Sequence, residues 1–188
     1  LDLRYVPPLA FRDCNYRAFI RDPAFAAAHR INGHFPPLSE AQGGHVRYVG
    51  GLVGHTFYTW LSPDQYFDTH PEYFSEIGGV RQRQDTQLCL TNPGLRAFFI
   101  DKLTGYIEQS RAEARANNAP PPTVFSISQN DWEGMCECDN CQAIAKAEES
   151  EAGPLLDFVN HIADAIREDY PEIYIDTLAY MMTQKPPK

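Results

Sequence analysis

The stretch Thr123-Val124-Phe125-Ser126-Ile127-Ser128, followed directly by Gln129-Asn130-Asp131, decides the fold. Its β-branched and aromatic residues predict a short buried strand, and the prolines at 120–122 separate that strand from a preceding helical pattern. Behind it come a second helical pattern and another strand candidate, Ile173 to Ala179. A strand, a helix and a strand in this order predict two parallel strands joined by a crossover connection.

The same alternation extends along the whole chain. Strand candidates occupy 9–12, 45–53, 86–90, 123–128 and 173–179. Between them lie helical patterns at 23–29, about 63–77, 93–118 and 155–166, with predicted N-caps at Asp22 and Asn92 and a predicted helix end at Gly78-Gly79.

Five β/α units of this kind predict an α/β fold, namely part of a (β/α)8 TIM-like barrel. A doubly wound sheet is the other candidate, but no glycine-rich phosphate loop follows the first strand. Because a barrel needs about eight strands to close, we expect residues 1–188 to form a single domain. This domain would be the N-terminal portion of a barrel, truncated at both ends, with the remaining strands elsewhere in the parent chain.

Composition limits the class of partner. The chain has 188 residues, 43% of them hydrophobic, and a net charge of −9. Because that charge repels phosphate backbones, we expect no nucleic acid partner. No apolar run approaches the roughly 18–20 residues that span a bilayer, so no membrane is expected either.

Three of the five cysteines lie within six residues, in the pattern Cys136-x-Cys138-x2-Cys141. With Cys89, at the end of the neighbouring predicted strand, they would supply four thiolates for a closed, structural zinc site. Two disulfides among the same four cysteines are the alternative that a secreted origin favours, and reduced thiols without a role are the third. Cys14 remains single and is expected to be a small buried residue.

Polar side chains follow the predicted strands, where β/α barrels carry their chemistry. Asp131, preceded by Asn130, comes directly after the fourth strand and is the predicted catalytic residue. His55, Tyr180 and Arg12 follow the second, fifth and first strands and are predicted to bind substrate together with Asn130. The alternatives are a turn capped by Asn130-Asp131, a glycine turn with an exposed His55, and a surface salt bridge for Arg12.

Several motifs recur in this order in one family: Gly54-His55-Thr56-Phe57, Tyr66-Phe67, His70-Pro71-Glu72-Tyr73-Phe74, Gln87-Leu88-Cys89-Leu90, Ser128-Gln129-Asn130-Asp131, Cys136-Glu137-Cys138-Asp139-Asn140-Cys141, Val159-Asn160 and Thr177-Leu178-Ala179-Tyr180. Through them, residues 9–188 resemble a domain-of-unknown-function family of large, mostly bacterial, secreted proteins. Its relatives are glycoside hydrolase barrels of the α-glucuronidase and β-hexosaminidase kind. The resemblance implies a carbohydrate partner and a secreted, periplasmic or cell-surface localisation.

Under this resemblance Asp131 becomes the general acid or a polarising carboxylate of a glycosidase. Cleavage of a glycosidic bond usually needs a second carboxylate, for which Glu133, Glu137, Asp139 or a residue outside the chain is available. The Asn-Asp pair departs from the Asn-Glu pair common in such barrels and shortens the reach of the acid by one methylene. A non-catalytic carbohydrate-binding barrel and a structural domain of a larger secreted protein are the alternatives.

Overall fold

The computed structural model describes residues 9, 11–33, 35–46, 48–49 and 52–188. The chain forms two compact units, Leu1–Tyr48 and Val49–Lys188. The single-domain organisation expected from the sequence stays a prediction.

In its described residues the first unit contains three short helices: α1 (Arg17–Arg21), α2 (Pro23–Ala28) and the 3-10 helix η1 (Glu40–Gln42). The side chain of Asp22 accepts a hydrogen bond from the backbone N–H of Phe25 at 3.0 Å, which confirms the predicted N-cap of α2. The strands expected at 9–12 and 45–53 are not regular strands in the described residues of these segments; positions 10, 47 and 50–51 lie outside the described residues.

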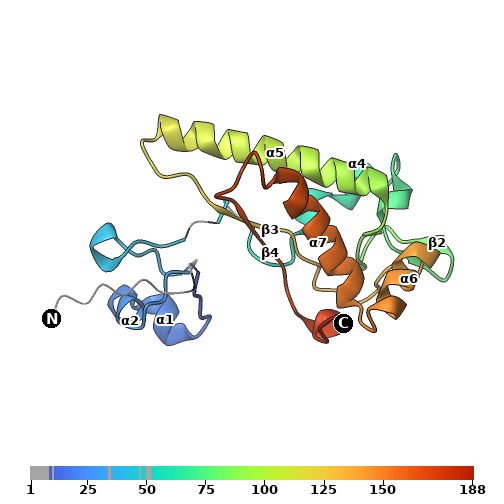
Figure 1. Ribbon diagram of the computed structural model, residues 1–188, viewed down its shortest axis with the longest axis horizontal. Helices are drawn as coiled ribbons and strands as arrows, with labels where there is room; N and C mark the ends of the chain where they lie inside the picture. The colour runs from blue at the N-terminus through green and yellow to red at the C-terminus, as the bar shows by residue number, and fades with distance from the viewer. Residues whose placement is uncertain (1–8, 10, 34, 47, 50–51) are drawn as a thin grey trace. The chain divides into compact units, whose positions relative to one another are not determined.

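The second unit carries the parallel strands and most of the helices (Figure 1). In chain order its elements are α3 (Phe57–Trp60), α4 (Pro63–Tyr66), η2 (Pro71–Tyr73), β1 (Glu76–Ile77), β2 (Val80–Arg81), α5 (Pro93–Ala116), β3 (Val124–Ser126), α6 (Asp139–Ala147), α7 (Ala152–Ile166), β4 (Tyr174–Asp176) and η3 (Met181–Thr183).

Strands β3 and β4 pair in parallel, with Phe125 opposite Ile175 and Ser126 opposite Asp176. Helices α6 and α7 connect them, so the predicted pair of parallel neighbours around a helical connection is confirmed. The partial (β/α)8 barrel of about five units stays a prediction.

Two residues that precede α3, Val49 and Thr56, bond to the side of the 124–128 segment that faces away from β4. The backbone N–H of Val49 donates to the carbonyl of Val124 at 3.1 Å, and that of Thr56 donates to the carbonyl of Ser128, also at 3.1 Å. The expected strand 86–90 does not extend this pairing. Leu88 instead forms an isolated antiparallel bridge with Phe74.

Helices α5 and α7 supply a large share of the hydrophobic core. Asn92 caps α5 through a 3.0 Å hydrogen bond from Leu95, and Pro93 occupies the first turn, as predicted. The ring of Phe99 on α5 meets that of Phe158 on α7 edge to face, 5.1 Å between centroids, and Figure 1 shows the two helices side by side. Phe125 of β3 belongs to the same core cluster as these two rings, so the strand packs against the helices.

The helix expected over residues 63–77 is wrong beyond its first turn. It ends at Tyr66, and Pro71 begins a separate 3-10 turn because proline cannot donate the hydrogen bond that would continue a helix. Gly78 and Gly79 do not end a helix. With φ values of 57° and 78° they form the two-residue turn between β1 and β2, a geometry that glycine adopts without strain.

Within the described part of the chain, no helix has both the length and the apolar character needed to cross a membrane.

Helices α6 and α7 approach closely at Gly153. A Cβ added there would lie 2.7 Å from the Cβ of Glu148, whereas a Cβ added at Gly105 on α5 would meet nothing within 4 Å. The short connection between α6 and α7 therefore requires glycine at position 153.

We expect Gly153→Ala to destabilise the protein by about 1–3 kcal/mol, because the added methyl group forces the two helices apart. The matched control, Gly105→Ala on the exposed side of α5, is expected to stabilise it by about 0.5–1 kcal/mol. Urea unfolding of both variants measures the difference. Equal stabilities would contradict the close approach.

Candidate functional site

Three of the predicted site residues meet near the carboxyl end of β3. The His55 Nε2 atom lies 3.9 Å from the Asp131 Oδ1 atom, and the rings of His55 and Tyr180 are 5.2 Å apart, edge to face. The Tyr180 hydroxyl is also hydrogen-bonded to the Asp131 carboxylate. An imidazole, a carboxylate and a phenol from three separate segments therefore form one cluster.

The orientation of His55 follows from its second ring nitrogen. Nδ1 lies 3.0 Å from the carbonyl oxygen of Gln129. Because a carbonyl only accepts, Nδ1 carries the proton, and Nε2 faces Asp131 with a lone pair when the ring is neutral and with an N–H when it is charged. His55 has φ 49°, a left-handed conformation that is uncommon for residues other than glycine and is often found at functional sites.

Asp131 changes the acidity of Tyr180. The negative charge of the carboxylate and its hydrogen bond to the phenol raise the pKa of Tyr180 above its ordinary value. The phenol therefore keeps its proton and donates a hydrogen bond to the Asp131 carboxylate.

Removing that charge is expected to lower the pKa of Tyr180. In Asp131→Asn the amide no longer opposes ionisation of the phenol, so its titration moves to lower pH. NMR of protein labelled with ¹³C at tyrosine Cζ follows the titration, and Tyr180→Phe assigns the signal. An unchanged Tyr180 titration in Asp131→Asn would show that the two groups do not interact.

Asn130 is buried, and its side-chain amide is already engaged. Its Oδ1 accepts from the backbone N–H of Tyr58 at 3.1 Å, and its Nδ2 donates to the carbonyl of Thr86 at 2.9 Å. These contacts describe a residue that positions Asp131. The predicted role of Asn130 in substrate binding stays a prediction.

Two buried glutamines hold the loop after β3, and sequence reasoning assigned neither of them a role. The Gln87 side chain accepts from the backbone N–H of Asn130 at 2.8 Å and donates to its carbonyl at 3.0 Å. Gln129 donates to the carbonyl of Leu178 at 3.0 Å and to the hydroxyl of Thr183 at 2.7 Å. The sequence signal was an uncharged amide next to a run of residues expected to be buried, Leu88 to Leu90 after Gln87 and Val124 to Ser128 before Gln129.

Trp132 was also missed by the sequence reasoning. It directly follows Asp131 and is 50% exposed, while Tyr180 is 40% exposed. Exposed aromatic rings beside polar groups suit the apolar face and hydroxyl rim of a sugar. An exposed aromatic residue next to a predicted acid was the sequence signal.

Arg12 belongs to the unit Leu1–Tyr48. Its backbone N–H donates to Asn32 Oδ1 at 2.9 Å, and its carbonyl accepts from the N–H of Asn32 at 3.0 Å. The predicted role of Arg12 in substrate binding stays a prediction.

The four cysteines singled out by their spacing form one cluster. The Sγ atoms of Cys89, Cys136, Cys138 and Cys141 all lie within 4.8 Å of one another, and those of Cys89 and Cys138 are 3.6 Å apart. Sulfur atoms in a disulfide are about 2.05 Å apart, whereas four thiolates bound about 2.3 Å from one ion stand about 3.8 Å apart. All five cysteines, each within the described part of the chain, are free thiols. The spacing is therefore compatible with four thiolates around one metal ion and excludes disulfides among these cysteines.

Local structure explains how the sulfur atoms meet. Cys138 is the N-cap of α6 and Cys141 lies in its first turn, so both thiols are at the positive end of the helix dipole. The hairpin of β1 and β2 contributes donors to Cys136: the N–H of Glu76 at 3.4 Å and the guanidinium of Arg81 at 3.7 Å. Donors of this kind stabilise thiolates and orient metal ligands.

The thiols strongly perturb one another. Hydrogen bonds from Cys136 and Cys141, assisted by Arg81, lower the pKa of Cys89, while hydrogen bonding to Cys136 and Cys89 raises the pKa of Cys141. Ionisation of one thiol in the cluster therefore makes ionisation of its neighbour less favourable. A divalent cation removes this effect, because it neutralises the charge that four thiolates bring together.

A hollow of about 620 Å³ adjoins the loop that follows Asp131. Of the acids considered as a second carboxylate, Glu133 and Glu137 line it, together with Glu151. Glu137 accepts a hydrogen bond from the N–H of Gly78 at 2.6 Å, so it is tied to the β1–β2 turn.

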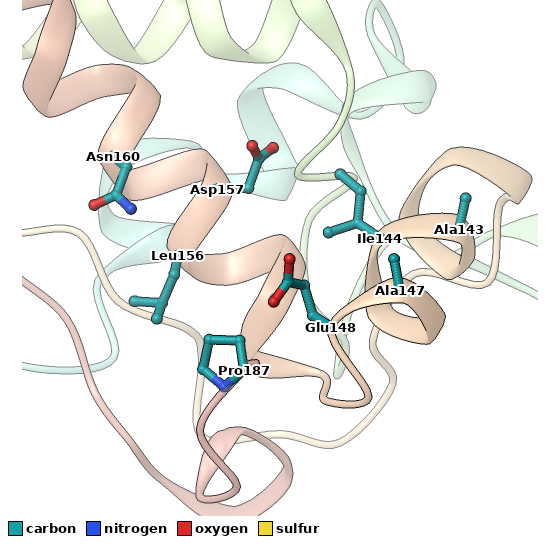
Figure 2. A pocket seen from close by; sticks show the side chains of 9 residues that line it. Ala143, Ile144, Ala147, Glu148, Leu156, Asp157, Asn160 and Pro187 are labelled. Atoms are coloured by element: carbon teal, nitrogen blue, oxygen red, sulfur yellow. The ribbon is translucent and has the colours of Figure 1, made fainter.

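A second hollow, of about 540 Å³, lies between α6 and α7 (Figure 2). Its lining contains none of the predicted site residues. Asp157, which Figure 2 shows on α7, forms an ion pair with Arg96. We assign no chemistry to this hollow.

Comparison with known families matches residues 1–188 to a family described as "Domain of unknown function (DUF4838)". No curated protein and no solved structure matches the chain.

Proposed function

Because the chain belongs to the family described as "Domain of unknown function (DUF4838)" and gathers a carboxylate, an imidazole and a phenol beside parallel strands, we propose that it acts on carbohydrates as part of a glycoside hydrolase-like β/α barrel. Family membership confirms the expected domain of unknown function. The relation to glycoside hydrolases and the secreted, periplasmic or cell-surface localisation belong to the proposal.

One observation carries the proposal: Asp131 lies 3.9 Å from His55, although 76 positions separate them in the sequence. Parallel strands deliver the loops at their carboxyl ends to a common edge, which is where β/α barrels carry their active residues. Tyr180, which follows β4, contacts both residues.

Two polar groups face the Asp131 carboxylate: the Tyr180 hydroxyl donates a hydrogen bond to it, and His55 Nε2 lies 3.9 Å from its Oδ1 atom. In the proposed reaction Asp131 stabilises positive charge that develops on the sugar ring, and His55 Nε2 can carry a proton. Glu133, two residues away in sequence, is the proposed source of a second carboxylate.

The alternative is a barrel that binds carbohydrate without cleaving it. The exposed rings of Trp132 and Tyr180 support binding in either case, because both offer apolar surface and a polar edge to a sugar. Only turnover distinguishes the two functions.

Asp131→Asn is therefore assayed against a panel of aryl glycosides and oligosaccharides in the full-length protein, which would carry the remaining strands of the expected barrel. We expect turnover to fall about 10²–10⁴-fold while glycan binding remains, because the amide retains the shape of the carboxylate but not its charge or proton chemistry. Asp101→Asn, an exposed acid on α5, is the matched control and is expected to retain full activity.

If the protein without substitutions binds glycans but does not cleave them, the result would support the non-catalytic carbohydrate-binding barrel. If the parent protein neither binds nor cleaves any glycan, the carbohydrate proposal is wrong.

We also propose that zinc is the ion held by the four cysteines. A tetrahedral set of thiolates with every position filled by protein is typical of structural zinc sites, which leave no coordination position for a substrate. The ion would stabilise the fold and not take part in the reaction.

Elemental analysis of the purified protein is expected to find one zinc ion per chain. Cys141→Ser removes a ligand and is expected to lower that content by more than half, because a serine hydroxyl is a poor zinc ligand. Cys14→Ser is the matched control, since Cys14 lies outside the cluster, and it is expected to keep its zinc. A metal-free parent protein would contradict the assignment.

A further inference from the structure

The loop that carries Asp131 is held at both ends by one short segment, residues 86–91. At the first end, the Gln87 side chain bonds to the backbone N–H and carbonyl of Asn130 and donates to the carbonyl of Trp132. At the other end, Cys136 meets Cys89 in the thiol cluster. The proposed acid and the proposed metal site are thus two ends of one loop.

The middle of the loop contacts the same segment. Gly134 has φ 82°, and a Cβ added there would lie 3.0 Å from the Cγ2 of Thr86. The carbonyl of Gly134 accepts a hydrogen bond from the backbone N–H of Gln87 at 3.3 Å. Little space remains for the loop to move relative to the segment.

The distance between the two attachments is short. Gln87 and Cys89 are two residues apart, which in extended chain is about 7 Å. Gln87 is fully buried, and Leu88 between them is fixed by its bridge to Phe74 and by the core. A displacement of Cys89 is therefore transmitted to the amide that holds Asn130 and Trp132.

We propose that the four-cysteine cluster positions the Asp131 loop: binding of a divalent cation orders residues 130–136, and Gln87 is the positioning residue that couples the two sites. This inference rests on the proposed metal site and is independent of the proposed glycosidase activity.

Coupling of this kind is reciprocal. If the bound ion stabilises the held loop, the held loop stabilises the bound ion by the same factor. Gln87→Glu keeps the size of the side chain and its acceptor oxygen but loses the two hydrogen bonds that its amide nitrogen donates to Asn130 and Trp132. The variant is therefore expected to weaken zinc binding although it changes no ligand.

Hydrogen exchange of the full chain, followed by mass spectrometry with zinc bound and after chelation, tests the first half of the inference. Amides of residues 130–136 are expected to exchange at least about tenfold faster without zinc, while those of α5 (Pro93–Ala116) are expected to stay protected. Fluorescence provides a second readout, because Trp132 lies in the loop and the other tryptophan, Trp60, is buried. The change on chelation is expected to be absent in Trp132→Phe.

Competition with a chromophoric zinc chelator tests the second half. Gln87→Glu is expected to bind zinc about tenfold more weakly than the parent protein, within the roughly 5–150-fold range of measured couplings. Gln109→Ala, on the exposed side of α5, is the matched control and is expected to bind zinc like the parent protein.

Unchanged exchange at 130–136 after chelation would overturn the inference, and so would equal acceleration in α5, which would mean that the ion stabilises the whole unit. Unchanged zinc affinity in Gln87→Glu would overturn the role of Gln87. Absence of bound metal would refute the metal proposal and this inference with it, whereas the carbohydrate proposal is tested separately by the glycan assay.

Discussion

The hydrogen bonds of the Gln87 side chain are the interaction on which the candidate site depends. A buried amide that accepts from one N–H and donates to two carbonyls replaces the strand pairing that the loop after β3 lacks. Without that amide, the polar backbone of Asn130 would be buried and unpaired, at a cost of about 1–3 kcal/mol for each group. Asp131 is consequently held by its neighbours in the chain, while its own side chain stays exposed to solvent.

Packing of helices against β3 fixes the place from which that loop begins. The rings of Phe57, Phe99 and Phe158 join α3, α5 and α7 into one core, against which Phe125 of β3 is buried. Because the strand is fixed from the helix side, the residues that follow it emerge at a defined place. His55 reaches the same place because residues on either side of it bond to the side of the 124–128 segment that faces away from β4.

The thiol cluster brings together groups that repel one another when they are ionised. Four sulfur atoms within 4.8 Å of one another repel when ionised, and Arg81, the N–H of Glu76 and the start of α6 offset only part of that charge. A bound divalent cation would supply the remainder. The thiol cluster adjoins the candidate site in the sequence, since Cys136 follows Asp131 by only five residues.

Local sequence determined the elements whose signals are local: the helices α5 and α7, the strands β3 and β4, and the N-caps at Asp22 and Asn92. It also singled out the four clustered cysteines, but left a metal site, two disulfides and unused thiols as alternatives. It failed at Gly78-Gly79, because two glycines suit a hairpin turn as well as a helix end. Only the tertiary structure decided that Gln87 holds Asn130, that Asn130 is buried, and that His55 meets Asp131. These contacts join residues 43 to 76 positions apart in the sequence. The periodicity of apolar residues predicts helices and strands, but it does not predict which distant group a side chain contacts.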